Sequence, residues 1–134
     1  MLRSRLAPAL RNRGFRGSGS NYQLPSDTHW ALIGFQGRTA NSPDRVLFTI
    51  NLKVVAKESW RAMFQEKPYI GEKPKANIKA GGDEWSVRIG QLMPERADRW
   101  WEVLRDRPTD QPAADALAAI DAHGIPAMLE RMRA

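Results

Sequence analysis

The stretch from Arg45 to Val55, RVLFTINLKVV, carries the clearest structural signal in the chain. Apolar side chains alternate along it with mainly polar ones, as expected of a strand whose successive side chains point to opposite faces. One set is Val46, Phe48, Ile50, Leu52 and Val54, and the other is Leu47, Thr49, Asn51 and Lys53. The alternation predicts an antiparallel sheet that is packed on one face and mostly polar on the other.

Shorter strands are predicted on both sides of this one, and helices beyond them. Strand-like segments run from Asn21 to Leu24, from Trp30 to Gln36 and from Glu84 to Leu92, where Trp85, Val87 and Ile89 point inward. Residues 57–65 are short and either helical or irregular. The predicted helices cover residues 1–13, with Leu2, Leu6 and Leu10 on one stripe, then 94–106, 110–123 and the end of the chain from Pro126.

The order of these elements predicts one domain of class α+β over residues 1–134. Three to four antiparallel strands form a sheet, and helices cover one of its faces in a two-layer arrangement. An N-terminal helix precedes the sheet and three C-terminal helices follow it. At 134 residues with 42% hydrophobic content, the chain is long enough for one core.

Short motifs along nearly the whole chain resemble those of one family. They are Gly14-Phe15-Arg16, Asn21-Tyr22, Phe48-Thr49-Ile50-Asn51-Leu52, Arg88-Ile89-Gly90-Gln91-Leu92-Met93-Pro94, Asp98-Arg99-Trp100-Trp101 and Gly124-Ile125-Pro126. The chain resembles the bacterial domain of unknown function 4304 family. This resemblance implies a bacterial cytosolic α+β domain and implies no activity, because none is established for that family.

Several kinds of chemistry have no support in the sequence. The chain has no Cys, which excludes disulfides, thiolate nucleophiles and thiolate metal sites and suits a cytoplasmic location. The two imidazoles, His29 and His123, have no ligand-like spacing to other residues. The carboxylate pairs Asp83/Glu84 and Asp98/Glu102 are explained as a turn and as a salt-bridged helix surface. We therefore predict no catalytic residue, metal or cofactor, and no membrane-spanning segment.

The net charge of +6 is concentrated in the first part of the chain. Residues 1–24 contain five Arg and no acidic residue, and residues 67–82 form a predicted exposed loop with four Lys. Such basic segments attract nucleic acid or an acidic protein. The simpler alternative is a solvated surface whose charge keeps the protein soluble.

The polar face of the sheet is the second candidate binding surface. Alternation allows two orientations of the strand: either Ala31, Ile33 and Phe35 face the core together with His29, or Trp30, Leu32 and Gly34 do. The first set is more apolar, which places Trp30 on the same face as Asn51, Lys53 and Arg88, and an exposed Trp is a common anchor for partners. Alternatively, a helix or a loop simply covers this face. The candidate partner-binding residues are Trp30, Asn51, Lys53 and Arg88 on the sheet, with Arg16, Lys73, Lys75 and Lys79 in the basic segments.

These observations favour a non-enzymatic binding domain that recognises an acidic protein partner through its basic surface and the open sheet face. A nucleic-acid-binding module that uses the same cations is the alternative. A small hydrolytic or transferase enzyme without a recognisable motif comes third.

Overall fold

The computed structural model describes residues 2–38 and 42–133. Within these two ranges, six strands form one antiparallel sheet in the order β1-β2-β3-β4-β5, with β6 also paired to β4. The strands are β1 (Arg16–Ser18), β2 (Asn21–Gln23), β3 (His29–Gly37), β4 (Arg45–Ala56), β5 (Trp85–Arg88) and β6 (Trp101–Leu104). Strands β5 and β6 share one edge of the long central strand: β5 pairs with its second half and β6 with its first.

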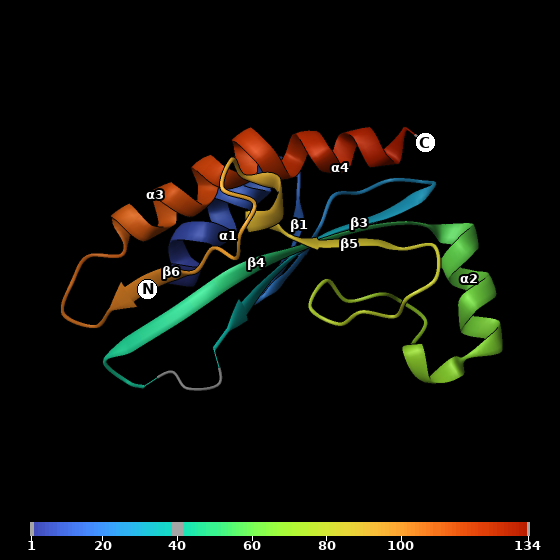
Figure 1. The fold of residues 1–134 in the computed structure, drawn as a ribbon, viewed down its shortest axis with the longest axis horizontal. Coiled ribbons are helices and arrows are strands. Elements are labelled where there is room, and N and C mark those ends of the chain that lie inside the picture. The colour runs from blue at the N-terminus through green and yellow to red at the C-terminus, as the bar shows by residue number, and fades with distance from the viewer. Residues whose placement is uncertain (1, 39–41, 134) are drawn as a thin grey trace.

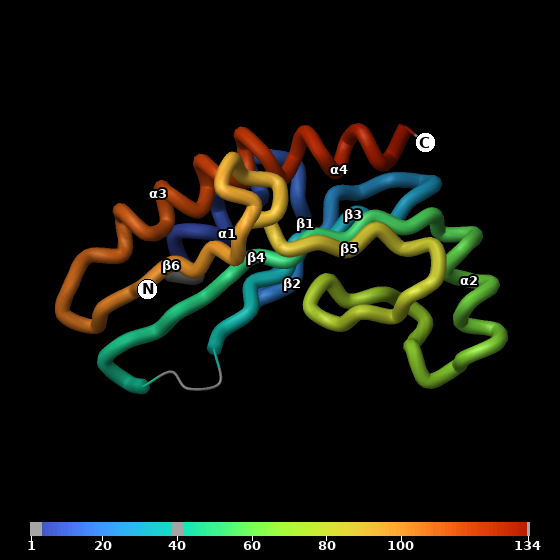
Figure 2. Tube along the Cα trace, viewed as in Figure 1, coloured from blue at the N-terminus to red at the C-terminus, as the bar shows by residue number. Residues whose placement is uncertain are grey.

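The α-helices are α1 (Leu2–Asn12), α2 (Lys57–Glu66), α3 (Asp110–Ala119) and α4 (Ile125–Met132), and a π-helical segment, Ile120–Gly124, joins the last two. Helices α1, α3 and α4 lie on one side of this sheet, α2 lies at one end of it, and an irregular segment lies on the other side (Figure 1). The trace in Figure 2 shows α1, α3 and α4 together above the sheet, while the chain that leaves α2 returns below it. The predicted α+β class with an antiparallel sheet is confirmed, but in the described residues the sheet has six strands where three to four were predicted, and two α-helices follow its last strand where three were predicted.

The main core lies between the sheet and α1, α3 and α4. The apolar set predicted from the alternation of β4 is buried here, with Phe48, Ile50, Leu52 and Val54 at 3% exposure or less. Only Val46, near the start of the strand, remains exposed among this set. Leu10 of α1 and Met128 of α4 complete the contacts from the helices. Burial of these apolar side chains determines which face of the sheet packs against the helices.

Residues 94–106 do not form the predicted helix. Trp101–Leu104 is strand β6, and Trp101 stands opposite Phe48 in the β4–β6 register with the two rings stacked 5.7 Å apart. Phe48 therefore packs on a Trp of the neighbouring strand β6, whereas a helix over 94–106 would have presented that Trp from a helix. The apolar spacing of this short segment fits a helix or a strand, and the unpaired edge of β4 selects the strand.

Two glycine-containing segments differ from what their composition indicates. The stretch 17–20 is only partly a turn: Arg16–Ser18 is strand β1, which pairs with β2, and the chain turns back through Gly19, whose φ of 64° suits glycine. At Gly124 the chain does not leave the helix but continues with helical backbone into α4. Among the helices that the structure describes, none is both long and apolar enough to cross a lipid bilayer.

An ion pair joins the residue that follows α1 to the π-helical segment between α3 and α4. Arg13 Nε lies 2.6 Å from Asp121 Oδ1, and Arg13 Nη2 donates to Oδ2 at 2.7 Å. The hydrogen bond from Arg13 holds the pKa of Asp121 below its ordinary value, while partial desolvation acts in the opposite direction. The same bond raises the pKa of Arg13. This bidentate pair spans 108 residues of sequence at the surface.

Candidate functional site

The polar residues singled out from the sequence share one face of the sheet, as predicted. In the register of β3, β4 and β5, Lys53 stands opposite both Leu32 and Ser86, while Asn51 stands opposite Gly34 and Arg88. Trp30 pairs with Val55, two positions further along β4. Because side chains alternate in strands, Trp30, Asn51, Lys53 and Arg88 all point away from the helices.

This face is not open, however, because the segment after α2 covers it. Lys53 is fully buried and Asn51 is 8% exposed. The Lys53 ammonium donates to the Ile78 carbonyl at 2.5 Å and lies 2.7 Å from Glu84 Oε2. The other oxygen of Glu84 accepts the backbone N–H groups of Ala80 and Gly81. The prediction of an open face is thus wrong at its centre, since Lys53 is bound to the chain's own loop.

Amide side chains fix the same loop beside Lys53. The Asn51 Nδ2 group donates to Gln36 Oε1 at 2.7 Å and to Asn77 Oδ1 at 2.8 Å, and Asn77 in turn donates to the Phe35 carbonyl. Gly34 lies directly beneath, where a Cβ atom would come within 2.3 Å of Asn77 Oδ1. The loop is therefore not exposed throughout: its lysines face solvent, but Pro74 and Ala76 are buried.

The covering loop divides the predicted binding residues between two hollows. The first, which we call the basic groove, has a volume of about 240 Å³ and is lined by Arg16, Gly17, Asn21, Tyr22, Gln23, Trp30, Leu32, Lys73, Pro74 and Lys75. Four of the eight candidate residues meet in this groove. It brings the end of the N-terminal basic segment next to the loop lysines, as a common basic surface requires.

The second hollow lies on the other side of the loop. It has a volume of about 410 Å³, and Asn51, Lys79 and Arg88 line it together with Gln36, Asn77 and Asp98. Arg88 Nη1 is paired with Asp98 at 3.0 Å, and its guanidinium lies over the ring of Trp100. The charge of Arg88 is thus already balanced within the chain. Trp30 and Arg88 share a face but line different hollows.

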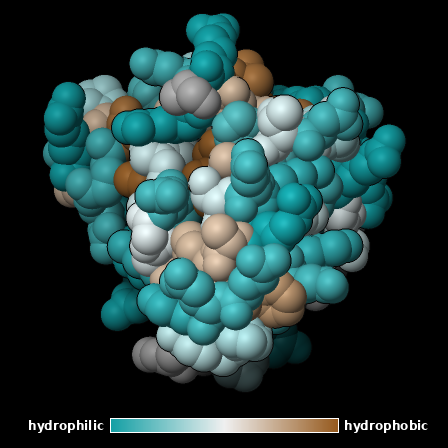
Figure 3. Space-filling model, turned by 90° about the vertical axis from the view of Figure 1, so that its right-hand side faces the viewer, coloured by the Kyte–Doolittle hydropathy of each residue, from teal (hydrophilic) through white to brown (hydrophobic). Residues whose placement is uncertain are grey.

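Trp30 is half-buried and belongs to the wall of the basic groove. The Lys57 ammonium lies 4.7 Å from its ring centroid and donates to the Ser26 carbonyl. A cation at this distance holds the indole in place. Seen from the α2 end, the surface is mainly hydrophilic and its apolar residues form small separate spots (Figure 3). This end of the molecule therefore has no large apolar patch in that view.

The residues considered for acid–base or metal chemistry lie apart or are paired. His29 Nδ1 lies 2.9 Å from Thr28 Oγ1. Asp98 and Glu102 do not form a helical pair, because Glu102 belongs to β6 and contacts Arg45. Within residues 2–38 and 42–133, no three His, Asp or Glu side chains are grouped so that they could hold a metal ion.

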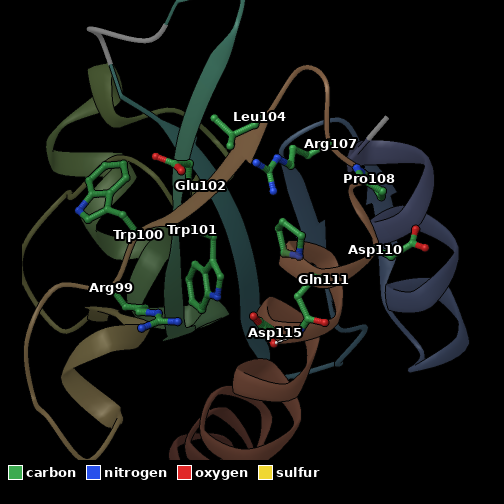
Figure 4. A pocket seen from close by; sticks show the side chains of 11 residues that line it. Arg99, Trp100, Trp101, Glu102, Leu104, Arg107, Pro108, Asp110, Gln111 and Asp115 are labelled. Atoms are coloured by element: carbon green, nitrogen blue, oxygen red, sulfur yellow. Dashed lines mark hydrogen bonds between the residues drawn. The ribbon is translucent and has the colours of Figure 1, made fainter.

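A further hollow, which the sequence did not suggest, lies between β6 and the start of α3. We call it the indole pocket; its volume is about 500 Å³, and Arg99, Trp100, Trp101, Glu102, Leu104, Arg107, Pro108, Asp110, Gln111, Pro112 and Asp115 line it (Figure 4). The sequence could not reveal it, because residues 94–106 were predicted to be a helix. The adjacent Trp100 and Trp101 were the available signal, because successive side chains of an extended chain point to opposite sides and both rings cannot then lie in the main core.

Comparison with known proteins places the chain in a family. Searches of curated proteins and of solved structures gave no match. The family described as "Domain of unknown function (DUF4304)" matches residues 6–130, which is nearly the whole chain and includes every strand of the sheet and most of α1 and α4. The resemblance inferred from the short motifs is thereby confirmed, and the chain belongs to the DUF4304 family.

Proposed function

We propose that the domain is a non-enzymatic binding module that recognises an acidic segment of a protein partner in the basic groove. The observation that carries this proposal is the charge of the lining: Arg16, Lys73 and Lys75 contribute three cations, and no acidic residue lines the groove. In the part of the chain that the structure describes, none of the three forms an ion pair. Free cations around an indole attract and orient carboxylates.

The groove supports a peptide more than a nucleic acid. A nucleic-acid footprint needs a row of phosphate contacts, and a protein that makes 6–10 of them gives a steep salt dependence. Here the cations of the groove are limited to three, and Arg88, in the neighbouring hollow, is neutralised by Asp98. The amides of Asn21 and Gln23 add donors and acceptors that suit a peptide backbone.

The test uses a fluorescein-labelled peptide of alternating Glu and Gly, with a labelled oligothymidine of similar length as the second probe. We expect the peptide to bind the wild-type chain and to lose at least about tenfold in affinity when Lys73 and Lys75 are both changed to Glu, because each reversal replaces attraction by repulsion. Fluorescence anisotropy at several salt concentrations measures both probes.

The matched control is Lys67→Glu, a charge reversal at an exposed lysine of the same segment that lines neither hollow, and it is compared with the single variant Lys73→Glu, which changes the net charge by the same amount. Equal losses in Lys67→Glu and in Lys73→Glu would mean that only net charge matters, which contradicts the groove. Tighter binding of oligothymidine, with a steep salt dependence, would instead favour the nucleic-acid alternative.

A second variant tests the anchor. Trp30→Ala removes the ring at the wall of the groove, and we expect it to weaken peptide binding by about tenfold or more while the melting temperature falls only slightly. The ring is half-buried and contacts Lys57, so part of its packing is lost as well. A melting temperature that collapses in Trp30→Ala would show that Trp30 is a core residue and would contradict its role as an anchor.

A further inference from the structure

The indole pocket contains a buried hydrogen-bond donor that has no acceptor. Trp101 is 4% exposed, its ring is stacked on Phe48, and the guanidinium of Arg99 lies 5.5 Å from its centroid. Its Nε1–H forms no hydrogen bond within the described residues. Buried donors are normally satisfied, so an orphan one in a native structure calls for an explanation. Because Trp101 lines the pocket, an occupant of that pocket is one such explanation.

The charges around this donor favour an anionic occupant. Among the carboxylates that line the pocket, Glu102 contacts Arg45, and Asp110 lies 2.5 Å from Arg5 Nη2. In the ranges that the structure describes, Arg107 has no such ion pair. In Figure 4 its guanidinium extends from the turn after β6 toward the hollow. Arg99, whose guanidinium lies over the Trp101 ring, has no such ion pair either, so two cations of the pocket face one carboxylate, Asp115, that no cation pairs within the described residues.

The start of α3 adds a second source of positive potential. Its first residues, Asp110, Gln111 and Pro112, line the pocket, and Thr109 at the cap position forms no side-chain hydrogen bond to the helix. Backbone N–H groups at a helix start that no side chain caps are able to bind an anion, and the helix dipole favours negative charge there. Leu104 and Pro108 supply apolar wall for the body of a ligand.

Two exposed side chains of α3 stand in front of the donor. Gln111 Nε2 donates to Asp115 Oδ1 at 2.8 Å, and in Figure 4 the nitrogen of the Trp101 ring faces the side of the pocket where these two residues lie. The Nε1–H is closed to solvent in this arrangement. A ligand oxygen reaches it when the exposed Gln111–Asp115 pair turns aside, a movement that requires only rotamer changes.

We infer that the indole pocket binds a small organic carboxylate that carries a second oxygen acceptor. The carboxylate lies against Arg107 and the start of α3, and the second oxygen accepts the Nε1–H of Trp101. A volume of about 500 Å³ is in the range of small-molecule sites. This site shares no residue with the basic groove, so the two proposals succeed or fail separately.

The test follows the Nε1–H signal of Trp101 by ¹H–¹⁵N NMR, with the signal assigned from its absence in Trp101→Phe. The probe is hippurate, which has a carboxylate, an amide oxygen and a ring; the neutral control is its carboxamide. We expect hippurate to shift the Trp101 signal more than those of the other four Trp. We also expect the affinity for hippurate to fall about tenfold in Arg107→Gln, because a charge-assisted hydrogen bond is lost. Arg105→Gln is the matched control, because Arg105 does not line the pocket.

Three results would overturn the inference. The first is a Trp101 signal that hippurate leaves unchanged, and the second is equal binding of hippurate and its carboxamide or equal losses in Arg107→Gln and Arg105→Gln. The third separates a ligand from an internal acceptor: if Asp115→Ala shifts the Trp101 signal strongly in the free protein and hippurate then has no effect, Asp115 is the natural partner of the indole. Under the inference, Asp115→Ala binds hippurate at least as tightly as the wild type, because a repelling carboxylate is gone.

Discussion

The two faces of the sheet are both covered, but by opposite means. On one face, α1, α3 and α4 bury apolar side chains such as Ile50 and Leu52. On the other, the irregular segment after α2 buries Lys53 and Asn51, and Thr49 is buried where it donates to the Arg99 carbonyl at 2.7 Å. The first face is held by the removal of apolar surface from water, which is not directional. The second is held by individual hydrogen bonds and an ion pair, each of which requires a specific geometry.

This difference shows why polar side chains along a strand are not necessarily exposed to solvent. A helix has no free backbone donors along its length and covers a sheet with side chains. An irregular segment does have free carbonyl and N–H groups, so it can satisfy polar residues of a sheet directly. Ile78 accepts from Lys53 through its carbonyl, and Ala80 and Gly81 donate to Glu84 through their N–H groups. Backbone groups of the loop thus satisfy the hydrogen-bonding groups of the buried polar side chains.

The largest effect is expected on the helix-covered face. Ile50→Asp places a carboxylate among apolar side chains with no partner, which costs several kcal/mol, on the order of the whole stability of such a domain. We expect the variant to be unfolded by circular dichroism. The control is Val46→Asp, on the same side of the same strand but exposed, which should fold. A folded Ile50→Asp with unchanged melting temperature would refute the assignment of this face.

The next largest loss of stability is expected when the ion pair between Lys53 and Glu84 beneath the loop is broken. Lys53→Met leaves the buried carboxylate of Glu84 without its cation, and breaking such a buried pair destabilises by about 3–5 kcal/mol. Urea denaturation of the single variant measures this loss in the free energy of unfolding.

The matched variant combines Lys53→Met with Glu84→Gln. Replacing both partners removes the uncompensated charge, and the Gln oxygen still accepts the N–H groups of Ala80 and Gly81. We therefore expect the double variant to be more stable than Lys53→Met alone. Additive losses would mean that the two side chains are not coupled, and the account of this face as ion-paired would then be wrong.

A smaller effect is expected where the loop touches the sheet. Gly34→Ala introduces a Cβ 2.3 Å from Asn77 Oδ1 and 2.8 Å from the Cβ of Ala76, so the loop must shift. Overpacking of this kind typically costs about 1–3 kcal/mol. Because the contact is with the loop alone, limited proteolysis should cut residues 71–82 faster while the core strands keep their protection in hydrogen exchange. Equal loss of protection in both regions would show that the faces are not independent.

Strand β4 could be predicted from sequence because its alternation continues over the whole strand and no helical period competes with it. Strand β6 could not. Its four residues follow Pro94 and contain Trp101 and Leu104 at helical spacing, so local pattern favoured a helix. The segment becomes a strand because the edge of β4 between Arg45 and Phe48, which β5 leaves unpaired, is available to pair with it. That information lies in tertiary structure and not in the local sequence.

The candidate site was predictable to a similar degree. Strand period places Trp30, Lys53 and Arg88 on one face, and this proved correct. The same reasoning could not show that Asn77 and Ile78, in a segment with no period, return to this face and bury Lys53. It also could not show that Arg16 meets Lys73 in one groove, because that contact depends on β1, a strand of only three residues around a glycine.

The smallest effect is expected for an ion pair on the helix side, and it sharpens the contrast with the buried pair of the other face. The side chains of Arg13 and Asp121 are 29% and 48% exposed, against 0% and 3% for Lys53 and Glu84. Water and salt screen an exposed pair, so Asp121→Asn should lower the free energy of unfolding by less than about 1 kcal/mol.

The contribution of this pair to stability also depends on pH, and the sign of that dependence follows from the pKa of Asp121. Because the folded-state pKa of Asp121 lies below its ordinary value, the pair's contribution is present above that ordinary value, about 3.9, and is lost as the pH falls through the lowered one. Urea denaturation at a series of pH values should therefore give wild-type and Asp121→Asn curves that are separated near neutral pH and converge in acid. Asp106→Asn, at an exposed carboxylate for which the described part of the chain supplies no ion pair, should show no such convergence. A loss in Asp121→Asn as large as that in Lys53→Met would mean that burial does not set the strength of these pairs, and the contrast drawn between the two faces would fail.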